Sequence, residues 1–519
     1  MPTITIDGKA LEFELGQSIL DVAHNNEMEI PHYCYHPSLS VVASCRICLA
    51  EVWAPNPRND NKLEPMPKLL PTCQTPAGDG QIVYTSSPKA TANQKAVMEM
   101  LLNHHPIDCP TCDQAGECDL QDYAYEYGRG ERRCDTEKIT QSKKDIGDNI
   151  MLYGDRCIMC TRCVRFADEI TGTSELYIEG RGAKECIDVF PGIGINNELS
   201  GNVIDICPVG ALLDKDFMFQ QRVWFLKTVP SIDPLTSSGD NIVIEHNNNQ
   251  VYRVKPRTNL EVNQYWITDE VRYGWKFVHD KTRVVDMDED AELIAADKLQ
   301  QASTIALLVS PMLSCEDAWL LGNLVRSIDK EAIVGVGPVP IDGDDKTFKS
   351  GFTIRSEKAP NARGVRRALG DVFEYDEWKK QMTSADTVVV TGNYPEAWDT
   401  PEISENQTLV LIDTLANGLT ERADAFLSAA TWAEKAGTFE NYDNKLQLFD
   451  RAIHPVGDSQ AEGQFAMNLQ ALVNDMEATV FNAATVRRRM ADAGIAGMLD
   501  VELPQNTNRI DTDMPLSEV

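Results

Sequence analysis

Twelve residues in the first 207 have the types and spacing that iron chemistry requires. They form three groups of four: Cys34, Cys45, Cys48 and Cys73; His105, Cys109, Cys112 and Cys118; and Cys157, Cys160, Cys163 and Cys207. Thirteen of the 14 cysteines lie in this region, and Cys315 alone follows it. The start, MPTITIDGKALEFELG, has no pattern of a secretory or mitochondrial presequence, so we expect a reducing compartment. Cysteines in C-x-x-C steps are there more typical of metal ligands than of disulfides.

The first group consists of four cysteines on a loop-rich stretch. Ten residues separate Cys34 from Cys45, two separate Cys45 from Cys48, and twenty-four separate Cys48 from Cys73. Four thiolates suit a [2Fe-2S] centre. A structural zinc site also accepts four cysteines, but such sites usually pair two C-x-x-C steps, and this group has one.

The second group combines one histidine with three cysteines in H-P-I-D-C-P-T-C-D-Q-A-G-E-C. One imidazole and three thiolates suit an iron-sulfur cluster or zinc. Neutral imidazole in place of a thiolate lowers the negative charge around a cluster, and this charge influences the reduction potential. His104 is the competing ligand, and its spacing favours it less than His105.

The third group has the spacing of a bacterial ferredoxin. Cys157, Cys160 and Cys163 form a C-x2-C-x2-C run, and Cys207 follows in D-I-C-P-V-G-A-L. This arrangement predicts a [4Fe-4S] cluster. The run occurs once, so Cys207 most simply completes the same cluster. The solitary thiols Cys134, Cys186 and Cys315 are predicted to be buried or idle.

The elements that must position these groups follow from sequence periodicity. Residues 3–14 predict two short strands around an Asp7-Gly8 turn, and residues 17–26 predict a short helix. Residues 55–67 are polar and contain prolines, which indicates a solvated insertion. Residues 90–103 have helical periodicity. Short strands are predicted within 223–255, and beyond residue 290 helices alternate with the apolar runs TIALLVS, AIVGVG, DTVVVTG and TLVLID, which predicts a parallel α/β layer.

Composition excludes two classes of partner. The net charge of −32 disfavours nucleic acid, because binding to a phosphate backbone requires clustered Lys and Arg. No apolar run approaches the roughly 18 residues of a membrane-spanning helix. We therefore expect membrane association through a larger complex only.

Long blocks of the front half resemble a known family. They are C-x10-C-R-I-C, N-H-H-P-I-D-C-P-T-C-D-Q-A-G-E-C-D-L-Q-D, D-R-C-I-M-C-T-R-C-V-R-F-A-D-E-I-T-G-T and E-L-S-G-N-V-I-D-I-C-P-V-G-A-L. The chain resembles the large iron-sulfur (G-type) subunit of NADH:quinone oxidoreductase, respiratory complex I. This resemblance implies a multidomain α+β and α/β fold. Its parts are a β-grasp [2Fe-2S] ferredoxin-type domain at 1–88, a His-ligated [4Fe-4S] domain at 89–135, a [4Fe-4S] ferredoxin-like domain at 136–217, a β-rich connecting segment without cluster cysteines at 218–280, a degenerate molybdopterin-oxidoreductase-like α/β domain at 281–500, and a tail at 501–519.

The same resemblance implies an electron-relay subunit with no catalytic residue or substrate site of its own. It carries one [2Fe-2S] cluster and two [4Fe-4S] clusters on the three groups, and no FMN or molybdopterin. Some members of the family hold a further cluster on C-x2-C-x3-C, but residues 227–241 lack cysteine, so that cluster is expected to be absent. The implied partners are the FMN/NADH-binding subunit, the small [2Fe-2S] subunit and quinone-module subunits. The implied location is the cytoplasmic side of a bacterial inner membrane, in the peripheral arm.

Two other functions fit part of the pattern. The electron-transfer subunit of a soluble NAD-linked hydrogenase or formate dehydrogenase has a similar order of clusters. A zinc-stapled interaction protein could also use many cysteines, but zinc chemistry does not call for three dissimilar sites close together.

Overall fold

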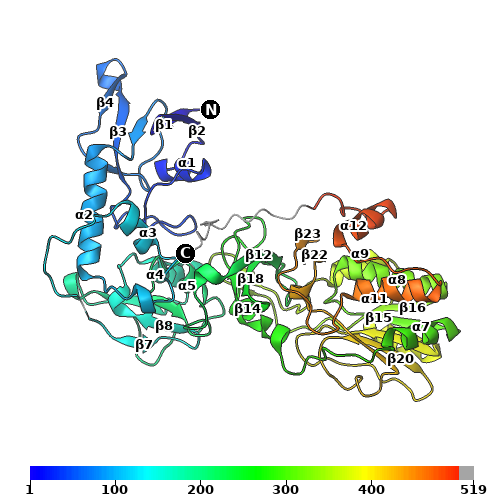
Figure 1. Cartoon of the computed structure of the whole chain (residues 1–519). Coiled ribbons are helices and arrows are strands. Elements are labelled where there is room, and N and C mark those ends of the chain that lie inside the picture. The colour runs from blue at the N-terminus through cyan, green and yellow to red at the C-terminus, as the bar shows by residue number, and fades with distance from the viewer. Residues whose placement is uncertain (139, 502–519) are drawn as a thin grey trace, which may run out of the picture. The chain divides into compact units, whose positions relative to one another are not determined.

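The computed structural model describes residues 1–138 and 140–501, and the predicted tail at 501–519 lies almost wholly outside them. The chain divides into two compact units, drawn from blue to green and from green to red in Figure 1. Unit 1 contains Met1–Phe225 and Phe348–Phe352. Unit 2 contains Leu226–Thr347 and the chain from Thr353 onward. The three predicted ligand groups all lie in unit 1.

Unit 1 begins with a sheet of strand order β2-β1-β6-β3-β4, in which β5 pairs with β3. Its strands are β1 (Thr3–Ile6), β2 (Lys9–Glu12), β3 (Leu49–Asn56), β4 (Lys62–Pro65), β5 (Leu70–Pro71) and β6 (Ile82–Tyr84). The predicted hairpin is confirmed: β1 and β2 pair around Asp7 and Gly8, which both have positive φ, as tight hairpin turns require. The predicted helix is also confirmed as α1 (Ile19–Asn25), which begins at Ser18 with a capping box to Asp21.

The insertion predicted at 55–67 is more regular than expected. It forms the tip of the antiparallel β3–β4 hairpin, with the 3-10 turn η1 (Pro57–Asn59) between the strands. The Asn56 side chain caps this turn by accepting a hydrogen bond from the Arg58 backbone, and Asp60 and Asn61 then reverse the chain with positive φ. Local turn chemistry therefore overrides the polar composition, while most of the hairpin's side chains stay exposed or half-buried.

The rest of unit 1 consists of short elements around one long helix. That helix, α2 (Pro88–His104), confirms the helix predicted at 90–103. The others are η2 (Cys109–Thr111), α3 (Asp119–Glu126), β7 (Lys143–Asp145), β8 (Ile150–Tyr153), η3 (Gly154–Arg156), α4 (Arg162–Arg165), the π-helical turn η4 (Phe166–Thr171), β9 (Leu176–Glu179), η5 (Gly182–Lys184), β10 (Cys186–Val189), α5 (Asn202–Asp205), β11 (Leu212–Asp214) and η6 (Val223–Phe225). Strands β11, β8 and β7 form one small sheet, and β10 and β9 another.

Unit 2 begins with the strands predicted within 223–255. They form the antiparallel sheet β12 (Lys227–Ile232), β13 (Asn241–Asn247) and β14 (Gln250–Pro256). The elements that follow are α6 (Asp269–Tyr273), η7 (Gly274–His279), α7 (Ala291–Gln301), α8 (Cys315–Ile328), β17 (Lys346–Thr347), β18 (Thr353–Ile354), α9 (Ala362–Leu369), α10 (Tyr375–Gln381), η8 (Met382–Ser384), η9 (Trp432–Glu434), β22 (Gly437–Glu440), β23 (Leu446–Phe449), α11 (Glu462–Val473) and α12 (Ala483–Asp492). Within the described residues, no helix is both long enough and apolar enough to span a bilayer.

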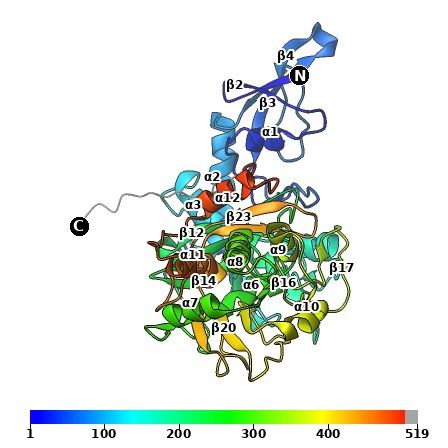
Figure 2. The ribbon, with the colours of Figure 1, turned by 90° about the vertical axis from the view of Figure 1, so that its right-hand side faces the viewer.

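A parallel sheet forms the centre of unit 2, as the four apolar runs predict. Its order is β16 (Ile333–Val336), β15 (Ile305–Val309), β19 (Thr387–Thr391), β20 (Thr408–Asp413) and β21 (Ala425–Ser428), and every neighbouring pair is parallel. Alternate residues of β15 face opposite sides. Leu307 lies in the core beneath α7, α8 and α11, whereas Leu308 packs with Trp378 of α10. Figure 2 shows α8 and α11 side by side. Both faces are covered, which explains the near-continuous apolar strand sequences.

Candidate iron-sulfur sites

The structure brings the first group together at one end of the N-terminal sheet. The Sγ atoms of Cys34 and Cys45 lie 3.5 Å apart, and those of Cys48 and Cys73 lie 3.6 Å apart. Cys34, Cys48 and Cys73 are buried and Cys45 is partly exposed. The loop between the cysteines contains Arg46 with positive φ, a conformation that residues other than glycine rarely adopt.

Backbone N–H groups face the thiols of this first group. The hydrogen bond with Cys45 and burial together raise the pKa of the Cys34 thiol, whereas the backbone N–H groups of Cys45 and Ser44 lower it. Such N–H groups favour sulfur in its thiolate form, which is the form that binds iron. The loop therefore supplies both the thiols and part of the polar environment that a thiolate cluster needs.

The second group begins where α2 ends. His105 caps the helix and precedes Pro106, and its Nδ1 atom is buried without a hydrogen-bond partner among the described residues. Burial, reinforced by the positive charges of Arg156 and Lys138, lowers the pKa of His105 to about 4. The imidazole is therefore neutral near pH 7, as a metal ligand must be. His104 lines the same 190 Å³ cavity as His105 and Cys157.

The cysteines of the second group lie on the turn and helix that follow. Cys109 is exposed, Cys112 and Cys118 are buried, and Cys118 directly precedes α3. Burial raises the pKa of Cys118 to about 12, while the backbone N–H groups of Gln121 and Leu120 at the start of α3 oppose this shift. The positive end of this helix thus favours a thiolate at position 118.

Gly210, in the loop of Cys207, leaves room for a ligand of the second group. A Cβ atom at position 210 would lie 2.2 Å from Cys112 Sγ and 3.0 Å from Gln114 Cβ. Any side chain larger than hydrogen would therefore displace Cys112. The Cys118 thiol also lies 3.9 Å from the Pro208 carbonyl oxygen. The D-I-C-P-V-G-A-L motif therefore contacts the second group as well as carrying Cys207.

The third group lies on one strained loop and one distant loop. Met159 and Thr161, which alternate with the cysteines of the C-x2-C-x2-C run, both have positive φ. Burial raises the pKa of Cys157 to about 12 and of Cys207 to about 11, and in each case another thiol of the group adds to the shift. The pKa of Cys163 is raised by burial and by all three of its predicted companions, Cys160, Cys157 and Cys207. The structure thus places these four thiols close together.

One hydrophobic core contains members of all three groups. Its residues include Cys34, Cys118 and Cys160 together with Tyr33, Ile47, Val97, Met98, Leu120, Tyr123, Val209 and Ala211. Cys45, Cys157 and Cys207 pack against its margin. The three groups are therefore neighbours in space, although they extend over about 175 residues of sequence.

Three buried arginines connect the loops that carry the ligands, and sequence reasoning missed all of them. Arg156, Arg162 and Arg165 are between 3% and 8% exposed. Arg162 donates to the Ile206 carbonyl oxygen, next to Cys207. All three occur in D-R-C-I-M-C-T-R-C-V-R, where arginines flanking the cysteines are the signal that could have identified them.

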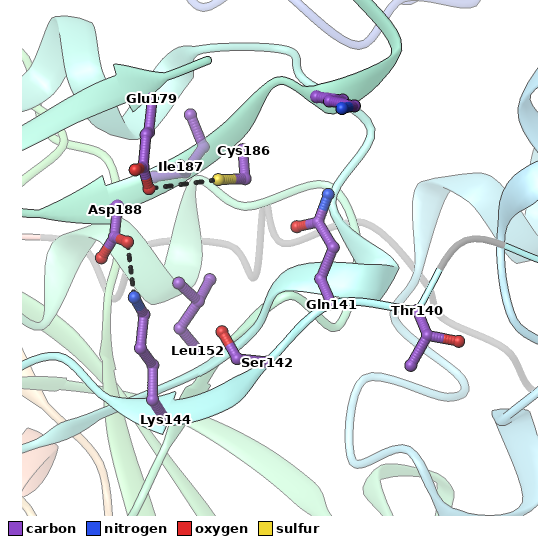
Figure 3. Close-up of a pocket in the computed structure, with 10 residues that line it drawn as sticks. Thr140, Gln141, Ser142, Lys144, Leu152, Glu179, Cys186, Ile187 and Asp188 are labelled. Carbon is purple, nitrogen blue, oxygen red and sulfur yellow. Dashed lines mark hydrogen bonds and ion pairs between the residues drawn. The ribbon is translucent and has the colours of Figure 1, made fainter.

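The three solitary thiols have different surroundings. Cys134 is exposed and Cys315 is buried in α8. Cys186 lines a cavity of about 380 Å³, where its Sγ lies 3.8 Å from Glu179 Oε2 and Lys144 pairs with Asp188 at 2.5 Å (Figure 3). Burial and the charge of Glu179 raise the pKa of Cys186, so it stays a neutral thiol near pH 7.

The donor set of the three groups fits iron-sulfur clusters. The twelve candidates are eleven free thiols and one neutral imidazole with an unpartnered nitrogen, and N–H groups face several of the thiols. Thiolates are the usual ligands of such clusters, and histidine also occurs among them. Among the described residues, no group of three or more His, Cys, Asp or Glu side chains converges on a point suited to a single metal ion.

Four family models match unit 1 and the start of unit 2. Residues 1–88 match a 2Fe-2S iron-sulfur cluster binding domain, and residues 94–133 match the NADH-ubiquinone oxidoreductase-G iron-sulfur binding region. Residues 147–213 match the ferredoxin-like domain of NADH-quinone oxidoreductase subunit 3, and residues 226–276 match the NDSU1/NuoG-like 4Fe-4S domain. The chain is 35% identical over 341 residues to the NADH-quinone oxidoreductase G-type subunit of Rickettsia bellii, an alignment covering 63% of this chain and 48% of that protein. The chain is a relative of the G-type subunits of NADH-quinone oxidoreductases.

Eukaryotic relatives of these G-type subunits match as well. The mitochondrial NADH-ubiquinone oxidoreductase 78 kDa subunit of Candida albicans is 36% identical over 370 residues, covering 68% of this chain and 49% of the relative. The corresponding subunit of Neurospora crassa is 43% identical over 273 residues, an alignment covering 52% of this chain and 35% of the relative. The chain thus spans about half the length of the first two relatives. A solved NAD+-reducing [NiFe]-hydrogenase structure matches at 29% identity with a TM-score of 0.37, covering 43% of this chain and 91% of that one.

These comparisons support the coarse fold expected for a relative of the G-type subunits. A 2Fe-2S domain precedes 4Fe-4S ferredoxin-like domains in a mixed α/β chain. Residues 226–276 match a domain named for a 4Fe-4S cluster, yet this segment contains no cysteine. It therefore offers no thiolate ligand for such a cluster.

Proposed function

We propose that this chain is an electron-relay subunit of an NADH:quinone oxidoreductase. One observation carries the proposal: ligand residues from three dissimilar groups belong to a single hydrophobic core. Dissimilar clusters held this close together suit the transfer of single electrons, and they have no evident use in hydrolysis or group transfer. The family relationship supports the same function.

We assign each ligand group to one cluster. Cys34, Cys45, Cys48 and Cys73 hold the [2Fe-2S] cluster; His105, Cys109, Cys112 and Cys118 hold one [4Fe-4S] cluster; and Cys157, Cys160, Cys163 and Cys207 hold the other. When bound, the clusters accept and release single electrons. The protein's own contribution is to fix their separation and to tune each potential through ligand charge, burial and N–H groups directed at sulfur.

The finer domain structure follows from this assignment. Residues 89–135 form the His-ligated domain, with the unpartnered Nδ1 of His105 as its supporting observation. The doubly covered parallel sheet of unit 2 supports a molybdopterin-oxidoreductase-like scaffold for 281–500. Because residues 226–276 lack cysteine, we propose three clusters in total, without FMN or molybdopterin on this chain.

The chain acts as part of a larger enzyme under this proposal. Its partners are the FMN/NADH-binding subunit, the small [2Fe-2S] subunit and the quinone-module subunits. It lies in the peripheral arm, on the cytoplasmic side of the membrane. The strongly acidic composition is consistent with docking against basic faces of such partners.

Iron and acid-labile sulfide analysis of anaerobically purified protein tests the proposal directly. Three clusters of the assigned types predict about ten irons per chain. Low-temperature EPR during stepwise reduction should then resolve one binuclear and two cubane signals. Zinc in place of iron would refute the relay function. A further cluster that depends on Cys134 or Cys186 would refute the ligand assignment.

A further inference from the structure

Arg165 lies at the junction between the first and third ligand groups. Its Nη2 donates to the carbonyl oxygen of Cys34 at 2.5 Å and to that of Cys160 at 3.3 Å. Its Nη1 donates to the Ser40 carbonyl oxygen at 2.5 Å. A single guanidinium therefore binds the backbones of two ligand residues that belong to different predicted clusters.

The charge of Arg165 is buried without a paired carboxylate. The residue is 8% exposed, and the described part of the chain contains no ion pair that includes it. Arginine remains protonated in proteins. Because burying a charge is costly without compensation, the anionic sulfur sites on both sides are its natural counter-charge.

Glu169 also binds Ser40, the residue whose carbonyl oxygen accepts from Arg165. Its carboxylate accepts hydrogen bonds from the Ser40 backbone N–H at 2.7 Å and from the Ser40 hydroxyl at 2.5 Å. The segment from Arg165 to Glu169 thus fixes the chain that follows Cys34 against the turn that contains Cys160. The separation of the two ligand loops depends on these contacts.

We propose that Arg165 is a positioning residue shared by the first and third groups, and that its positive charge raises the reduction potentials of the clusters bound there. Reduction adds negative charge to a cluster, and a fixed neighbouring cation stabilises the reduced form. The cation acts on both sites because it contacts a ligand residue of each. This inference rests on the proposed relay function.

Arg156 provides a matched control within the same sequence run. It is also buried, but its guanidinium binds Asp108 Oδ2 at 3.1 Å and the Gly210 carbonyl oxygen at 3.4 Å, and it stacks on Tyr153. Asp108 directly precedes Cys109 and Gly210 lies against Cys112, so both partners of Arg156 are at the second group. Removing Arg156 should therefore leave the first site unchanged.

The test is an EPR-monitored redox titration of the intact complex containing Arg165→Gln, Arg165→Lys or Arg156→Gln. In Arg165→Gln, the midpoints of the [2Fe-2S] site and of the all-cysteine [4Fe-4S] site should both fall, and that of the His-ligated site should not move. Arg165→Lys retains the charge and should restore most of both shifts. Arg156→Gln should leave the [2Fe-2S] midpoint at its original value.

Several results would overturn this inference. They are unchanged midpoints in a fully loaded Arg165→Gln protein, equal shifts at all three sites, or a fall in Arg165→Lys as large as in Arg165→Gln. If Arg165→Gln does not load all of its clusters, the iron content and EPR signals decide. Loss confined to the first and third sites supports the positioning role of Arg165, and equal loss at all three sites contradicts it. Zinc, or no EPR signal in the unmodified protein, would instead mean that the relay function itself is wrong.

Discussion

Gly210→Ala is the substitution with the most sharply defined consequence. The new Cβ would lie 2.2 Å from Cys112 Sγ and 3.0 Å from Gln114 Cβ. Non-bonded heavy atoms prefer separations of about 3.5–4.0 Å, so the Cys112 sulfur must move by more than about 1 Å. The backbone at Gly210 does not have positive φ, so the strain comes from this overlap alone. Inserting a methyl group into such a packed site costs about 1–3 kcal/mol.

Cluster content is the most direct assay for this substitution. Displacing Cys112 should remove or distort the His-ligated cluster, and its complete loss would lower iron from about ten to about six per chain. The EPR signals of the other two sites should remain, because no ligand of either site is among the three atoms nearest to the new Cβ. Urea titration of unit 1 should show the loss of about 1–3 kcal/mol in the free energy of unfolding.

Gly130→Ala is the matched control. A Cβ at position 130 meets nothing within 4 Å, and the backbone there lacks positive φ. This variant should retain full iron content and stability. The reasoning would be refuted if Gly210→Ala retained all iron with an unchanged His-ligated signal, or if both glycine variants lost iron equally.

Four further substitutions test other parts of the molecule. His105→Cys should keep a cluster but lower its midpoint, because a thiolate adds negative charge, and an unmoved midpoint in a redox titration would count against His105 as a ligand. Cys207→Ala should abolish the EPR signal of the third site alone, so loss of the [2Fe-2S] signal would contradict the grouping. Lys435→Met should lower the free energy of unfolding of unit 2 by about 3–5 kcal/mol, because Lys435 is buried and pairs with the buried carboxylates of Asp317, at 3.1 Å, and Glu462. An unchanged urea concentration at half-unfolding would contradict this. Burial raises the pKa of Asp413 to about 6, so this group's stabilising effect is complete below about pH 4 and is lost as pH rises through 6. The free energy of unfolding of Asp413→Asn, taken relative to that of the native protein, should therefore rise by about 3 kcal/mol from pH 4 to pH 7. Parallel pH profiles of the two proteins would show that Asp413 is not responsible.

Local patterns in the sequence predict much of the secondary structure. The Asp7-Gly8 hairpin, helix α2 and the four apolar strands of unit 2 are confirmed, because each depends on near-neighbour periodicity or turn chemistry. The hairpin at 55–67 does not follow from the polar composition, because the local turn chemistry of Asn56, Asp60 and Asn61 brings its two strands together. The resemblance to the G-type subunits is also confirmed.

The candidate site is only partly readable from sequence. Ligand spacing identifies twelve residues, whose assignment to clusters stays a prediction. It does not reveal that Arg165 joins Cys34 to Cys160, or that Gly210 abuts Cys112, because these contacts connect positions about 98 to 131 residues apart. Arginines near the cysteines mark the region in the sequence, but only the fold shows that the Arg165 guanidinium is buried between two ligand loops.

The shared core has a consequence for how the protein matures. Cys34, Cys118 and Cys160 are both ligands in the proposed assignment and packing residues of one core. Binding of metal to thiolates contributes directly to folding free energy where the ligands are brought together by the fold. Cofactor delivery and core closure are then a single process, so a chain deprived of iron-sulfur precursors should accumulate with unit 1 protease-sensitive while unit 2 remains resistant.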